Sequence, residues 1–126
     1  MGADQIAAIR PAIAELEAAA RNSAGEFVAR FEIPGSHPLW VEVVLGTVNV
    51  AYPWVDDPRE RLLRQGISPL PKMTLTEWQP KLFATFLYEL GTPSREVARF
   101  VDRVLGEMLG GAADYEVDVA IDRIAN

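Results

Sequence analysis

The stretch LWVEVVLGTVNVAYPW, residues Leu39–Trp54, decides the fold, because it joins two alternating apolar runs through a tight turn. Gly46-Thr47 predicts a two-residue loop of type II′, whose twist suits antiparallel strands. Folding the chain about this loop predicts a β-hairpin in which eight apolar side chains share one face. The expected cross-strand pairs are Leu45 with Val48, Val43 with Val50, Val41 with Tyr52, and Leu39 with Trp54.

The opposite face of this hairpin is mixed in character. A slip of one residue would exchange the two faces, so the pattern itself favours a single register. A tryptophan on the mixed face is explained equally well by a second buried layer and by a protein interface. We predict that this face contacts a partner, with the second buried layer as the alternative. The predicted contact residues are Trp40, Glu42, Val44, Asn49 and Ala51.

A helix and a strand are expected before the hairpin. Apolar residues recur at helical spacing between residues 4 and 21, with Asp4 as the expected N-cap. Pro11 removes a backbone hydrogen bond, so we expect a kink there or a late start near Arg10. Residues 27–33 alternate as a strand, which together with the hairpin predicts an antiparallel meander.

A short helix and an ambiguous segment follow the hairpin. Asp57 as the N-cap and Pro58 at the first helical position predict a short helix that stops at Gly66. Residues 67–73 are expected to form a loop. Residues 81–90 fit a helix by their apolar spacing and a strand by their aromatic content, and propensity does not separate the two.

The last third of the chain predicts one long helix and a strand. The helix is capped at Thr92-Pro93 or Ser94, has a wide apolar face, and ends at Gly110-Gly111. Residues 115–122 alternate apolar and acidic side chains, which is typical of a half-buried strand. A helix over the same residues is the alternative.

Size, charge and residue content restrict the function classes. A chain of 126 residues with 49% hydrophobic residues can bury one core, so we expect one domain over residues 1–126. The absence of cysteine excludes thiol catalysis and thiolate metal sites. A net charge of −6 disfavours nucleic acid as a partner. Without a cationic leader or a long apolar run, we expect a cytoplasmic protein that does not bind membranes.

No motif indicates catalysis, and we expect no enzyme activity, no metal and no cofactor. Ser36-His37 lacks a third member of a catalytic triad, so loop polarity explains it better. In Asp56-Asp57, the capping role already accounts for Asp57 without acid-base chemistry. Glu116, Asp118 and Asp122 lack a loop that would converge oxygen ligands on a cation, and we interpret them as the polar side of a strand.

The arrangement of these segments resembles the YbjN-like and type III secretion chaperone-like (TY-Chap) group. The similarity spans nearly the whole chain, through EFVARFEI, LWVEVVL, TVNVAYPW, RERLLRQGI and REVARFVDRVLGEML, and its best local feature is Leu-Leu-x-x-Gly-Ile at Leu62–Ile67. The resemblance implies a strand within residues 81–90. It implies an α+β fold of order α-β-β-β-α-β-α-β, an antiparallel meander packed by an N-terminal helix and a long C-terminal helix.

The resemblance also implies a small, acidic, cytoplasmic protein that holds an extended segment of a partner. We expect a noncatalytic protein- or peptide-binding module, a chaperone or adaptor, which forms a homodimer. A small-molecule sensor or small enzyme is one alternative, with a pocket between the long helix and the sheet and Glu42 or Asp102 as candidate carboxylates. An immunity or scaffold protein is another.

Overall fold

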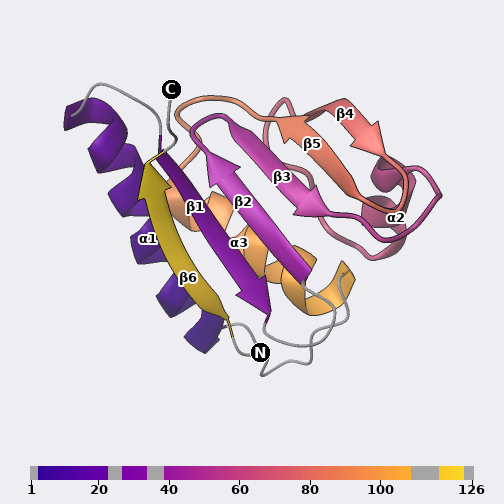
Figure 1. Ribbon diagram of the computed structural model, residues 1–126, viewed down its shortest axis with the longest axis horizontal. Helices are drawn as coiled ribbons and strands as arrows, with labels where there is room; N and C mark the ends of the chain where they lie inside the picture. Colours follow the sequence, from indigo (N-terminus) through magenta and orange to yellow (C-terminus); the bar gives the residue numbers. More distant parts are fainter. Residues whose placement is uncertain (1–2, 23–26, 34–38, 109–116, 124–126) are drawn as a thin grey trace.

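The computed structural model describes residues 3–22, 27–33, 39–108 and 117–123, and Figure 1 shows its elements. Along the chain they are α1 (Ala3–Asn22), β1 (Phe27–Ile33), β2 (Leu39–Val44), β3 (Thr47–Ala51), α2 (Pro58–Arg64), β4 (Thr74–Gln79), β5 (Phe83–Leu87), α3 (Ser94–Arg103), a π-helical turn η1 (Val104–Met108) and β6 (Asp118–Arg123).

The six strands form one antiparallel sheet in the order β4-β5-β3-β2-β1-β6, which confirms the α+β class. The strands expected within residues 81–90 and 115–122 are present as β5 and β6. The sequence interpretation missed β4, which pairs with β5. The reversal between them contains Lys81 at φ 69°, a left-handed conformation that propensity and periodicity do not reveal.

The central hairpin has the expected faces but a different turn. Val44 pairs with Thr47, so the two turn residues are Leu45-Gly46 rather than Gly46-Thr47. Gly46 has φ 85° and occupies the second turn position, where a type II turn requires a positive φ. The register therefore differs by two residues from the predicted one. Because side chains alternate with a period of two, the same residues still face the core, except Leu45, which is 40% exposed in the turn.

One face of the sheet carries the core. Phe31, Val41, Val43 and Val48 are completely buried there. In Figure 1, α1 and α3 lie behind the sheet. The side of α3 that faces this layer is equally apolar. Val97 and Val101 of α3, and Val104 and Leu105 of η1, are at most 1% exposed, and all belong to the same hydrophobic cluster as the strands.

Helix α2 and the loop that follows it extend this layer behind β3, β5 and β4. Leu62 of α2 and Ile67 and Leu70 of the loop join the same buried cluster as Phe86 of β5. The predicted start of α2 is confirmed: the Asp57 carboxylate accepts a hydrogen bond from the Arg59 N–H, and Pro58 occupies the first turn. The helices described therefore all lie on one side of the sheet (Figure 1).

The predicted start of α1 needs correction, whereas α3 begins where predicted. α1 runs without interruption from Ala3 through Pro11, so Asp4 lies inside its first turn and the expected start near Arg10 is wrong. α3 has Pro93 at its N-cap position, and no side chain caps the helix, because proline has no side-chain acceptor. The neighbouring Thr92 hydroxyl donates to the Glu89 carbonyl oxygen. The predicted end of this helix at Gly110-Gly111 lies outside the described residues.

Candidate functional site

The face of the sheet that points away from the helices (Figure 1) is here called the helix-free face, and the strand register places the predicted contact residues on it. Cross-strand pairs fix which side chains share this face, since directly opposite residues point to the same side. Its central residues are Arg30 and Glu32 on β1, Trp40, Glu42 and Val44 on β2, Thr47, Asn49 and Ala51 on β3, and Phe83, Thr85 and Leu87 on β5.

A hydrogen-bonded row of four side chains, here called the polar ladder, crosses the middle of this face. It consists of Arg30, Glu42, Asn49 and Thr85, which lie directly opposite one another on β1, β2, β3 and β5. Arg30 Nη1 donates to Glu42 Oε2 at 2.7 Å, Asn49 Nδ2 donates to Glu42 Oε1 at 3.4 Å, and Thr85 Oγ1 donates to Asn49 Oδ1 at 2.9 Å. The ladder members therefore satisfy one another.

Apolar side chains lie on both sides of the polar ladder. Trp40 and Phe83 are partly buried on one side, and Val44 and the 48% exposed Leu87 are on the other. The Arg30 guanidinium carbon lies 5.0 Å from the centre of the Trp40 ring, which holds the indole in a cation-π contact. The helix-free face thus combines a fixed polar centre with apolar borders.

The structure brings four of the five predicted contact residues to a partly exposed surface and covers the fifth. Trp40, Glu42, Val44 and Asn49 are partly exposed, whereas Ala51 is only 5% exposed. Ala51 is flanked by Phe83 in the register, so its small side chain lies below the larger ones. Ala51 therefore has little side-chain surface to present to a partner.

Sequence reasoning missed the contributions of β1 and β5 to this face, namely Arg30, Phe83, Thr85 and Leu87. The sequence could have placed Arg30 on this face, because it is a cation at an outward position of the alternating strand 27–33. Its placement opposite Glu42 requires the register of β1 on β2, which the loop between them does not specify. To place Phe83 and Thr85 on this face, one must know that β3 pairs with β5. The paired residues are at least 32 positions apart in the sequence.

A second polar cluster, around Asp56, connects Tyr52 to α2. The Tyr52 hydroxyl donates to the Asp56 carbonyl oxygen at 2.7 Å and lies 2.9 Å from its carboxylate, which also accepts hydrogen bonds from Arg61 and Arg64. Arg61 stacks on Trp54 at 3.9 Å. Partial desolvation opposes ionisation of Asp56, but the hydrogen bonds from Tyr52 and the two arginines outweigh it and lower the pKa of this carboxyl group.

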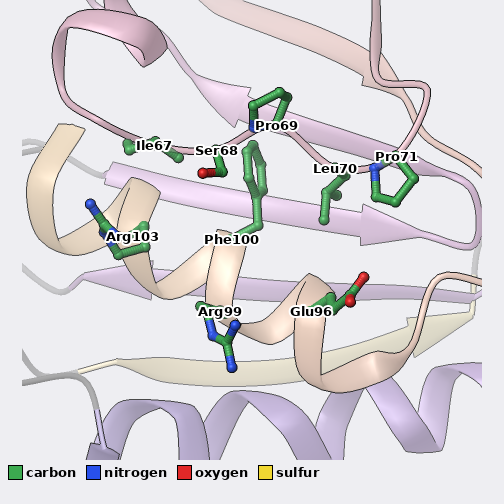
Figure 2. Close-up of a pocket in the computed structure, with 9 residues that line it drawn as sticks. All are labelled: Ile67, Ser68, Pro69, Leu70, Pro71, Glu96, Arg99, Phe100 and Arg103. Atoms are coloured by element: carbon green, nitrogen blue, oxygen red, sulfur yellow. The ribbon is translucent and has the colours of Figure 1, made fainter.

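A pocket of about 310 Å³ lies between α3 and the loop that follows α2 (Figure 2). The Phe100 ring points toward Pro69 across the pocket, whereas the Arg99 side chain points away from the loop. Arg103, at one end, donates to the Gly66 carbonyl oxygen at 3.2 Å. The pocket lies beside α3, because the space between α3 and the sheet is filled with buried apolar side chains.

The two carboxylates that were candidates for a pocket between the long helix and the sheet, Glu42 and Asp102, do not lie in one site. Glu42 is in the polar ladder on the helix-free face, whereas Asp102 is 8% exposed on α3, on the other side of the sheet. Among the described residues, no group of three or more histidine or acidic side chains is placed to hold a metal ion. Ser36-His37 and Glu116 lie outside the described residues, and Asp118 and Asp122 are exposed on β6.

Comparison with known proteins finds no similar protein. No family model matches this chain, and no curated protein or solved structure matches it either. Within the described part of the chain, no helix is both long and apolar enough to cross a membrane.

Proposed function

We propose that this protein is a noncatalytic binding module that holds an extended segment of a partner protein on its helix-free face. The observation that carries the proposal is the composition of that face, where partly exposed Trp40 and Phe83 and exposed Leu87 border a fixed polar row. Aromatic side chains at such positions anchor partners at low entropic cost. In keeping with the TY-Chap resemblance, the module acts as a small acidic cytoplasmic chaperone or adaptor.

The polar ladder supports a role in binding more than one in catalysis. A general acid or base needs a proton that it can exchange with a substrate, whereas Glu42 is held by Arg30 at 2.7 Å and by Asn49 at 3.4 Å. Side chains fixed by one another lose little conformational freedom when a partner covers them. The ladder therefore offers a preorganised surface.

Site-specific photocrosslinking in the native host tests this proposal. A photoreactive residue at Val44, on the helix-free face, is expected to give a discrete adduct with a protein partner. The matched control replaces Glu15, which is exposed on α1. The Val44 adduct should weaken when Trp40→Ala removes the aromatic anchor. Equal labelling from both positions, or a Val44 adduct unaffected by Trp40→Ala, counts against the helix-free face as the binding site.

The pocket beside α3 favours a second candidate function, the binding of a small molecule. Its volume of about 310 Å³ is at the lower end of the range found for ligand sites, and Phe100 and Pro69 give it an apolar wall. The expected sign of a ligand is a rise in melting temperature that Phe100→Ala removes and Trp40→Ala does not. A ligand whose stabilisation depends on Trp40 instead would place small-molecule binding elsewhere.

A further inference from the structure

The carboxylates of the helix-free face differ in whether a cation lies beside them. On the β1 and β2 side, the Arg30 guanidinium serves two carboxylates, Glu42 at 2.7 Å and Glu32 at 3.6 Å. On the neighbouring edge strand β6, Asp118 lies opposite Glu32 and Asp122 lies opposite Val28, so both aspartates share this face. The ion pairs between described residues include neither aspartate, and both are exposed. Among the described side chains, the β6 end of the face therefore carries negative charge that no ion pair offsets.

The opposite part of the face has a different character. Trp40, Phe83, Val44 and Leu87 supply apolar surface over β2 and β5. The polar ladder between them is already internally hydrogen-bonded, so a partner gains little by competing for its groups. Apolar contact is then the main source of affinity on this side, and electrostatic attraction acts at the β6 side.

The distance between the two parts sets the length of a matching ligand. From β5 to β6 there are four strand intervals in the sheet order. At roughly 4.8 Å per interval this is a span of about 19 Å, and an extended chain rising about 3.3 Å per residue covers it with about six residues. A single short segment that crosses the strands can therefore reach both the apolar surface and the free aspartates.

We infer that the partner segment is cationic at one end and apolar at the other, with its lysine or arginine residues over Asp118 and Asp122 on β6 and its apolar residues over Trp40 and Phe83. This inference rests on the proposed function and adds the chemistry and the orientation of the partner. Complementary charge accelerates encounter and excludes segments of the wrong sign, while the apolar end slows dissociation.

Three synthetic peptides of one length test the inference, each with an apolar half of alternating valine and threonine ending in phenylalanine. The other half is three lysines, three glutamines or three glutamates. Binding is followed by fluorescence anisotropy of a dye on the peptide, at low and at physiological ionic strength. The lysine peptide should bind most tightly, and Asp118→Asn with Asp122→Asn should weaken it by about five- to tenfold, as two partly exposed charge pairs suggest.

A matched control separates local charge from net charge. Glu15→Gln with Glu60→Gln removes two exposed carboxylates from the helices and changes the net charge by the same amount. This variant should bind the lysine peptide like the wild type. An equal loss in both double variants, or equal binding of the lysine and glutamate peptides, overturns the inference. Because the substitutions are isosteric and exposed, thermal melts should change little, with the larger change in the control variant, since Glu60 lies in the first turn of α2.

The outcomes also distinguish this inference from the proposed function. If the glutamine peptide binds as well as the lysine peptide and Trp40→Ala weakens both, the helix-free face binds partners but without a preference for cations. That result overturns the inference and leaves the proposed function standing. If none of the peptides binds and Val44 gives no adduct in cells, the proposed function itself fails.

Discussion

Arg30 on β1 and Glu42 on β2 lie directly opposite each other on the helix-free face, with Arg30 Nη1 2.7 Å from Glu42 Oε2. Their side chains are 35% and 27% exposed, so the pair is neither fully solvated nor buried. It connects the cation-π contact on Trp40 to the remainder of the polar ladder through Asn49. The pair therefore contributes to the stability of the sheet and also holds the side chains that form the surface of this face.

A double-mutant cycle on this pair should give a modest coupling energy. Partly exposed pairs contribute between a few tenths and about 1 kcal/mol, and the hydrogen bond to Asn49 adds to the cost of removing Glu42. We expect Glu42→Ala to destabilise more than Arg30→Ala, with a coupling of about 0.5–1 kcal/mol in urea unfolding. Additive single effects would show that the contact is not maintained in solution.

The two faces of β2 should respond differently to an introduced charge. Val43 is completely buried, so Val43→Asp places an unpaired carboxylate in the core at a cost comparable with the whole folding free energy. Val44 is partly exposed on the helix-free face, and Val44→Asp should cost about 1 kcal/mol or less. Thermal melts of both variants decide the matter. Equal damage would mean that the helix-free face is covered in the isolated protein, and the binding surface would be lost.

These two positions also show what sequence alone can deliver. The period of two in residues 39–54 was sufficient to assign Val43 to the core and Val44 to the other face, even though the predicted turn was displaced by one residue. A displacement of the turn by one residue changes the register by two, and an even change preserves the faces. The alternation of β1 and β6 was visible for the same reason.

The parts of the fold and of the candidate site that were not predicted, β4 and the contribution of β5, depend on long-range pairing that local sequence patterns do not contain. β4 was missed because Thr74–Gln79 has only two partly buried positions, Leu75 and Trp78, and a bulge between Leu75 and Glu77 interrupts its alternation. Thr85 joined the polar ladder only through the pairing of β5 with β3. Long-range register is set by the whole sheet, so half of the candidate site was beyond sequence reasoning.

Gly46 should tolerate alanine poorly, mainly because of its backbone conformation. Its φ of 85° lies in the left-handed region, and an added Cβ would lie 2.9 Å from Leu90 Cδ2. Leu90 is 65% exposed and its terminal methyl group can rotate away, so the contact adds little. We expect Gly46→Ala to cost about 1–2 kcal/mol.

Gly66 supplies the matched control for this variant. Its φ is 70°, and an added Cβ would meet nothing within 4 Å. Gly66→Ala should therefore show the backbone cost alone, close to that of Gly46→Ala, in chemical denaturation. If adding Leu90→Ala to Gly46→Ala restores most of the lost stability, the steric contact with Leu90 dominates. The backbone conformation of Gly46 would then not be the main cause of the loss.

Alkaline conditions should weaken the attachment of α2 through Tyr52. Burial, followed by the hydrogen bond to Asp56, raises the pKa of the Tyr52 hydroxyl from 10.0 to about 12, with Arg61 acting in the opposite direction. Since the folded state holds the proton more tightly than the unfolded state, this contribution is complete below pH 10 and is lost as the pH rises toward 12.

Tyr52→Phe isolates this contribution. The variant should be less stable at neutral pH, because it lacks the bonds to Asp56, and its free energy of unfolding should fall less steeply between pH 10 and 12. The difference in slope integrates to about 2–3 kcal/mol for a shift of this size. Tyr88, whose pKa burial also raises, remains in both proteins and serves as the internal reference. Identical slopes would contradict the assignment.

The last expectation is that the protein forms a homodimer through β4. β6 pairs with β1 within the chain, so the edge strands among the described residues are β4 and β6. Two β6 edges would bring together the exposed Asp118 and Asp122 of both copies, whereas β4 carries one carboxylate, Glu77, and lies beside the apolar groove bordered by Leu63 and Leu75.

A two-fold contact at β4 would pair its free backbone groups and cover Leu63, which is 71% exposed, on both copies. Repulsion between two chains of charge −6 opposes association, but a Debye length of about 8 Å at physiological salt screens most of it. Light scattering over micromolar concentrations should give a dimer mass, and Leu63→Glu should give a monomer. A wild-type monomer mass at every concentration would reject the dimer and leave the β4 edge free for a different partner.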